Sequence, residues 1–201
     1  MSASLTTYEM QLVTDPQVLL TKNLIIEKVY EIFGELAEEY KEISTKIPGF
    51  ERFINPKISK GENYKGLPYV ILDFPRQFGK ADVFAIRSFF WWGNFFSITL
   101  QLAGQYQRQY ASAIENAINN RFFEEWYIGM LESQWEHHFE SNNYSSLSQR
   151  IDYNIAELPY LKLAKKIPLK KWDETSTFFI RNFTLLAETL GSMHRFGEKD
   201  L

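Results

Sequence analysis

The sequence contains no cysteine, which excludes thiol nucleophiles, disulfides and cysteine metal sites. Histidine is also scarce, with three residues among 201. The lack of thiols fits a reducing compartment, and we expect a cytoplasmic protein. The first fifteen residues have no basic region followed by a continuous apolar one, so we expect no signal peptide.

An excess of positive charge is lacking as well. The 22 Lys and Arg residues are outnumbered by 25 Asp and Glu residues, for a formal net charge of −3. Because binding to nucleic-acid phosphates depends on clustered basic residues, we expect no nucleic-acid partner. Aromatic residues are abundant by contrast, at 16 % of the chain. Their large side chains indicate a ring-rich core, a ring-rich binding face or both.

One long apolar stretch, residues 84–104, is not expected to cross a membrane. Arg87 lies inside it, and Gly93-Asn94 is a turn dipeptide near its middle. Ser97, Thr99 and Gln101 recur at a spacing of two, which is typical of a strand. The stretch therefore predicts a β-hairpin, and we expect no membrane partner.

The remaining elements follow from apolar periodicity and from capping residues. A long helix is predicted from Pro16, capped by Asp15, with Gly34 as a potential break. Consecutive strands with short connections predict an antiparallel sheet with helices mainly on one face, in a single α+β domain of residues 1–201. Strands are expected at 56–60, 65–74, 82–92, 95–103, 122–131 and, from a weaker pattern, 160–169. A loop is expected at 75–80, and further helices are expected after Gly104 and from Asp173. Residues 133–150 have no clear pattern and are left unassigned.

The hairpin can be divided into two faces. With a two-residue loop at Gly93-Asn94, Trp92 pairs with Phe95, and Phe90 and Trp92 share a face of rings and small polar groups with Phe95. Such a face is a candidate ligand surface. A covering second layer and a dimer seam are the alternatives. A loop of four residues keeps these faces, whereas a loop of three exchanges the faces of one strand.

Arg87 lies on the other, apolar face in this pairing, opposite Leu100. A buried guanidinium needs a carboxylate, and Asp73 and Asp82 are the nearby candidates. We expect a structural ion pair, with an anion-binding arginine as the alternative. A second group of basic and aromatic residues is either a solvated edge or a site for a phosphate or an acidic peptide. Its members are Lys57, Lys60, Tyr64, Lys65 and Arg76.

Signals for catalysis and for metals are weak. His137 and His138 lie among Glu132, Glu136 and Glu140, but adjacent histidines point apart on a helix or a strand. We therefore expect no metal site and no cofactor. No Walker loop, dinucleotide-binding glycine pattern or nucleophile elbow is present. The lysine pairs on either side of Pro168 indicate a solvated face.

The segment Lys57–Lys65, Lys-Ile-Ser-Lys-Gly-Glu-Asn-Tyr-Lys, leads into a strand and then into the aromatic hairpin. It resembles bacterial families described only as domains of unknown function, which have comparable Ser-Lys and Tyr-Lys pairs at the entry to a central antiparallel sheet. The resemblance implies an α+β fold and a bacterial source. It implies no catalytic residue.

The sequence thus predicts a non-catalytic domain that binds a small molecule, a peptide or a second copy of itself, as a homodimer, through the mixed aromatic and polar sheet face. The alternative is an enzyme that acts on an anionic substrate. Its substrate-binding residues would be Tyr64, Lys65, Arg76 and Arg87.

Overall fold

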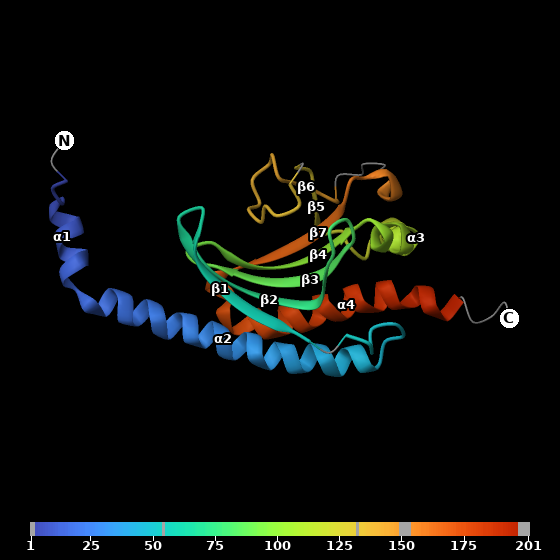
Figure 1. Cartoon of the computed structure of the whole chain (residues 1–201), viewed down its shortest axis with the longest axis horizontal. Helices are drawn as coiled ribbons and strands as arrows, with labels where there is room; N and C mark the ends of the chain where they lie inside the picture. The colour runs from blue at the N-terminus through green and yellow to red at the C-terminus, as the bar shows by residue number, and fades with distance from the viewer. Residues whose placement is uncertain (1–2, 54, 132, 149–153, 197–201) are drawn as a thin grey trace.

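The computed structural model describes residues 3–53, 55–131, 133–148 and 154–196. It confirms the α+β class. Within these residues, one antiparallel sheet has the strand order β1-β2-β3-β4-β7-β5-β6 (Figure 1). The strands are β1 (Lys57–Tyr64), β2 (Leu67–Phe78), β3 (Val83–Trp91), β4 (Phe95–Ala103), β5 (Tyr127–Gly129), β6 (Tyr144–Ser146) and β7 (Leu161–Pro168). The helices are α1 (Thr7–Thr14), α2 (Pro16–Thr45), α3 (Gln105–Asn119), η1 (Ile155–Glu157), η2 (Leu169–Glu174) and α4 (Thr175–Phe196).

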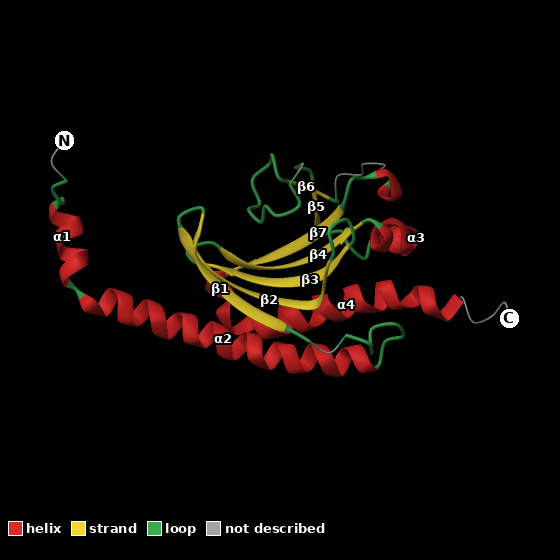
Figure 2. Ribbon diagram, in the orientation of Figure 1, coloured by secondary structure: helices red, strands yellow, loops and turns green. Residues whose placement is uncertain are grey.

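Helices α2 and α4 lie together on one face of the sheet, and α3 lies at one end of this layer (Figure 2). The predicted start of α2 is confirmed, because the Asp15 carboxylate accepts the Gln17 N–H at 2.9 Å. Gly34 does not break the helix. The apolar stripe continues on both sides of it, and Tyr40 stacks on Phe183 of α4 with ring centres 3.8 Å apart.

The β3–β4 hairpin turns through three residues rather than two, so the predicted pairing was wrong. Trp91 pairs with Phe95, and Arg87 pairs with Thr99 instead of Leu100. The even-numbered residues of both strands therefore face the helices, and the odd-numbered residues face away. Gly93 has a positive φ of 72°, which suits a three-residue loop as well as a two-residue one.

Two other strands are longer than predicted. β1 continues to Tyr64, with a register irregularity after Gly61, and the turn is made by Lys65 and Gly66, which both have positive φ. β2 extends to Phe78, through the first part of the predicted loop at 75–80. Its register with β3 shifts by one residue between Asp73 and Arg76. This β-bulge accommodates Pro75, which cannot donate to a regular ladder.

The later elements match the predictions unevenly. The weak strand at 160–169 is confirmed as β7, whereas only 127–129 of the predicted strand at 122–131 forms β5. The unassigned region contributes β6, and the last helix starts at Thr175, after η2. Helix α1 was not predicted. Residues 133–143, which we call the strap, cross the sheet face that lies opposite the helices (Figure 1).

Candidate functional site

A polar centre lies on this second sheet face, beneath the strap. It consists of one side chain from each of five neighbouring strands. The pairing of Asp73 with Arg87, and of Gln101 with Lys162, places these side chains on the same face. Lys162 is only 1 % exposed and Arg87 9 %. The five residues are Tyr64, Asp73, Arg87, Gln101 and Lys162.

The predicted ion pair between Arg87 and Asp73 is confirmed, and it is bidentate. The Arg87 Nε–Asp73 Oδ1 distance is 2.7 Å, and the Nη2–Oδ2 distance is 3.0 Å. Arg87 Nη1 lies 2.9 Å from His137 Nε2. Because a guanidinium only donates, Nε2 is the acceptor, and the proton of the neutral ring is on Nδ1. Burial first, and then the charges of Lys162 and Arg87, hold the pKa of His137 well below its usual value, so the ring is neutral.

Sheet side chains anchor the strap at successive positions. The Tyr64 hydroxyl accepts the backbone N–H groups of His137 at 2.7 Å and His138 at 3.1 Å, and it donates to the Glu136 carboxylate at 3.1 Å. Gln101 Nε2 donates to Gln134 Oε1 at 2.8 Å. The Lys162 ammonium donates to the Glu136 carbonyl. These bonds are internal to the chain, which indicates that the polar centre is a structural link between sheet and strap.

Lys162 is the most perturbed cation of this centre. Burial, followed by the charge of Arg87, lowers the pKa of its ammonium from 10.5 to about 7, while Glu136 opposes this shift. The ammonium also lies 5.3 Å from the centre of the Tyr144 ring. A neutral amine can still donate to the Glu136 carbonyl, so the link does not depend on the charge.

We expect stability to rise with pH between about 7 and 10.5, because the unfolded chain then holds a proton on Lys162 that the folded chain releases. The slope contributed by this residue is at most about 1.4 kcal/mol per pH unit. Urea denaturation at pH 7.5 and 9.5 measures it. The Lys162→Met variant should lose this rise, whereas Lys170→Met, at an exposed position, should keep it. Equal rises in both variants would contradict the shift.

The predicted site residues do not form one site. Tyr64 and Arg87 both contact His137 in the polar centre. Arg76 is exposed, and its guanidinium lies 5.6 Å from the Phe78 ring centre, which is 6.0 Å from that of Arg87. Lys65 lies in the β1–β2 turn. Lys60 is on the helix side, 5.9 Å from the ring of Tyr30 in α2.

Two aromatic residues that were predicted to share a ligand face with Phe95 lie on the opposite face of the sheet. Phe90 is buried in the core beneath the helices, and Trp92 packs beside it. The three-residue loop is the reason, because it separates them from Phe95. Phe95, like Tyr64, lies on the second face, where it borders an open cleft.

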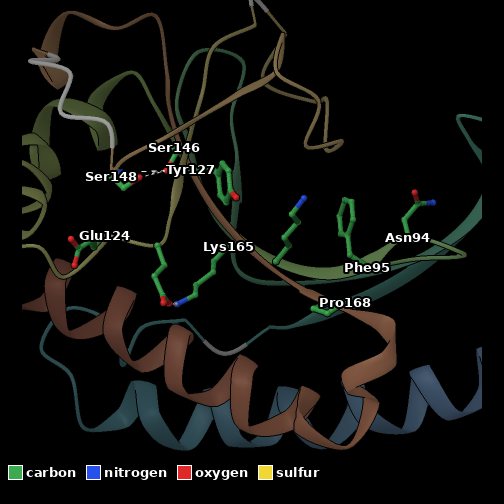
Figure 3. Close-up of a pocket in the computed structure, with 10 residues that line it drawn as sticks. Asn94, Phe95, Glu124, Tyr127, Ser146, Ser148, Lys165 and Pro168 are labelled. Carbon is green, nitrogen blue, oxygen red and sulfur yellow. Dashed lines mark hydrogen bonds and ion pairs between the residues drawn. The ribbon is translucent and has the colours of Figure 1, made fainter.

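The cleft has a volume of about 690 Å³ and follows the outer part of β7. Figure 3 shows Phe95 and Tyr127 projecting to the same side of the sheet, with Ser146 and Ser148 beyond them. The volume falls within the range of about 300–1,000 Å³ that is usual for ligand sites. The lining residues are Asn94, Phe95, Glu124, Glu125, Tyr127, Ser146, Ser148, Lys165, Lys166 and Pro168.

The floor of the cleft is a free strand edge. β4 pairs with β7 along its length, but β5 reaches only Leu163 and Ala164. Within the described chain, residues 165–168 of β7 therefore have no strand partner on the β5 side. Backbone N–H and C=O groups alternate between the two sides of a strand, so some of those at Lys165 to Ile167 point into the cleft.

Two adjacent lysines of β7 have different environments. Lys165 forms an ion pair with Glu125 at 2.6 Å. Lys166 is exposed, and its ammonium lies 4.7 Å from the Phe139 ring centre and 5.7 Å from that of Phe95. The ion pairs identified among the described residues do not include Lys166. Its charge is thus held over aromatic rings and is accessible from the cleft.

Sequence reasoning missed this cleft because it interpreted the lysines as a solvated face. The available signal was strand alternation, which places Lys165 and Lys166 on opposite faces of β7. Among the described residues, no cluster of three or more carboxylate or histidine side chains is arranged to hold a metal, and Glu132 lies outside them. No helix in the described ranges has the length and apolarity to cross a membrane. Comparison with family models, curated proteins and solved structures gave no match.

Proposed function

We propose that this chain is a non-catalytic module that binds an extended acidic peptide in the cleft along β7. The unpaired edge of residues 165–168 carries the proposal, because an extended peptide can add to such an edge as a further strand. The peptide would occupy the position that β5, with its three residues, leaves vacant.

Of the four charged residues that line the cleft, Glu124 pairs with Arg121 and Glu125 pairs with Lys165, which leaves Lys166 as the charge that a ligand can meet. Lys166 projects on the strap side, where it can pair with a carboxylate next to the rings of Phe95 and Tyr127. In a strand, alternate side chains point to opposite faces, so a peptide with an acidic group at every second position would present it to Lys166. The Ser146 and Ser148 hydroxyls offer further polar contacts beside the edge.

An enzyme acting through the polar centre has less support. Asp73, Arg87 and Lys162 are each at most 9 % exposed, and their contacts are made by the chain itself. A substrate would reach them only after the strap had left the sheet. The cleft, by contrast, is open as the chain stands.

Isothermal titration with a blocked hexapeptide of alternating valine and glutamate tests the proposal. We expect a dissociation constant on the order of 10–100 μM, typical of a short peptide on one strand edge. Lys166→Ala should weaken binding about tenfold, by loss of a charge-assisted contact of about 1.4 kcal/mol. Lys170→Ala provides the matched control, since this exposed lysine lies outside the cleft.

A second comparison separates strand addition from simple charge attraction. Methylation of alternate backbone nitrogens of the hexapeptide removes hydrogen-bond donors and should abolish binding if the peptide pairs with β7. Equal affinity for the methylated peptide, or for free glutarate, would instead identify the cleft as a small-anion site. A lysine-for-glutamate hexapeptide that binds as well as the acidic one would refute the role of Lys166.

A further inference from the structure

The N-terminal part of the chain forms an arm that carries an unusual amount of exposed apolar surface. We call residues 3–25 the arm. α1 has no buried residue, and the first buried side chain of α2 is Ile26, so the arm extends away from the sheet (Figure 1). Nine large apolar side chains on it are between 40 % and 69 % exposed. They are Leu5, Tyr8, Met10, Leu12, Val13, Val18, Leu19, Leu20 and Leu24.

The arm is nevertheless a well-formed structure. Thr6 caps α1 in a capping box, with its hydroxyl accepting the Glu9 N–H and the Glu9 carboxylate accepting the Thr6 N–H. Asp15 ends α1 and caps α2. At the base of the arm, Lys22 forms an ion pair with Glu62 at the end of β1. Local sequence therefore specifies two helices whose apolar side chains have no cover within the described chain.

The extent of the arm matches what a stable interface needs. The arm spans residues 3–25, with nine exposed apolar side chains, and one partner of a standard interface contributes about 20–30 residues and about 800 Å². Val18, Leu19 and Leu20 are consecutive and so point in three directions about 100° apart around the helix. A helix that is apolar on several sides needs to be enclosed by neighbours rather than laid on a flat surface.

The charges of the arm disfavour a lipid surface and favour pairing with itself. Residues 3–21 contain Glu9 and Asp15 but no Lys or Arg, whereas helices that bind membrane interfaces depend on cationic residues. In an antiparallel pairing about a two-fold axis, the register that places Leu12 of one copy opposite Leu19 of the other also places Glu9 beside Lys22 of the other copy. The Lys22 ammonium, with three donor hydrogens, would then bridge this Glu9 and Glu62 of its own chain. The same symmetry repeats both contacts, as a closed dimer requires.

We propose that the arm is a homodimerisation element, in which two copies of this chain pack their arms against each other antiparallel. The pairing encloses the apolar side chains of both arms and leaves the β7 cleft of each copy open. This surface is separate from the cleft, so the dimerisation proposal and the peptide-binding proposal can be tested independently.

Sedimentation velocity of the full chain between 1 and 100 μM tests the proposal. We expect a dimer with a dissociation constant below about 1 μM. The double substitution Leu12→Glu Leu19→Glu should weaken association at least 100-fold. The matched control, Phe122→Glu, places a charge at another exposed apolar residue outside the arm and should leave the dimer unchanged. A wild-type chain that stays monomeric, with or without lipid vesicles present, overturns the proposal, as does a double variant that still dimerises.

Charge reversal keeps the apolar side chains intact and covers the case in which the double variant does not fold. Glu9→Lys, which also removes the capping box of α1, and Lys22→Glu, which also removes the ion pair with Glu62, should each weaken self-association, because like charges then face each other between the copies. Recovery in a mixture is therefore the deciding result, since it depends on the intermolecular charges alone. An equimolar mixture of the two variants restores both opposite-charge contacts and should recover the dimer. Failure of the mixture to exceed either variant alone overturns the antiparallel pairing.

Discussion

Replacing Asp73 with alanine is expected to lower the free energy of unfolding by about 3–5 kcal/mol, because it leaves the Arg87 guanidinium buried without its carboxylate. Both oxygens of Asp73 are engaged by Arg87, at 2.7 and 3.0 Å, and Arg87 is 9 % exposed. His137, the other contact of the guanidinium, is neutral and cannot replace the lost charge. Urea denaturation followed by tryptophan fluorescence gives the free energy.

Substitutions of Arg87, alone and together with Asp73, distinguish the loss of the ion pair from the cost of a buried charge without a partner. Arg87→Met keeps the stem volume but leaves the Asp73 carboxylate buried and unpaired, so it should also be strongly destabilising. The double variant Asp73→Asn Arg87→Met removes both charges and should recover most of the loss. If the double variant is as unstable as the sum of the two single variants, the ion pair is not what stabilises this part of the sheet.

The second large effect is expected for Trp91→Ala, at about 3–5 kcal/mol. Trp91 is 6 % exposed, and its ring centre lies 5.1 Å from that of Tyr64 and 5.5 Å from that of Phe95. Its indole N–H donates to the Tyr64 carbonyl at 3.2 Å. Truncation therefore leaves a cavity in the small aromatic cluster that supports the strap and also leaves a carbonyl without its donor.

Trp135→Ala is the matched control for this truncation. Trp135 lies on the strap and is 47 % exposed, so its loss should change the free energy of unfolding by less than about 1 kcal/mol. Equal effects of the two substitutions would show that the aromatic cluster contributes nothing beyond the general loss of a large side chain.

The hairpin illustrates how far the sequence could be read. Phe89 and Trp91, which share the face of Arg87 in β3, are buried at 1 % and 6 % exposure, but this face lies under the strap and not under the helices. Every residue of β3 and β4 is buried, so the sequence does not show which face of the hairpin packs against the helices. Only the length of the loop decides the pairing, and Gly93-Asn94 fits both lengths. The partner of Arg87 was still found, because a buried charge permits few alternatives.

The cleft could not be predicted in the same way. It exists because β5 begins only at Tyr127, opposite Ala164, and leaves residues 165–168 of β7 uncovered, and strand ends are poorly specified by local sequence. The strap consists of irregular backbone whose contacts with Tyr64, Gln101 and Lys162 span from 26 to 74 residues of sequence separation. Such long-range contacts carry no periodic signal. The role of Lys166 could not be predicted either, because it depends on the rings of Phe95, Tyr127 and Phe139, which only the fold brings around its ammonium.

Backbone amide exchange of β7, followed by NMR with and without saturating acidic hexapeptide, tests the central claim most directly. If the peptide adds as a strand, those amides of Lys165, Lys166 and Ile167 that point away from β4 become protected, because they gain hydrogen bonds to the peptide. Amides of the strap should be unaffected. Unchanged exchange along β7, or protection that appears only at the strap, would contradict the account.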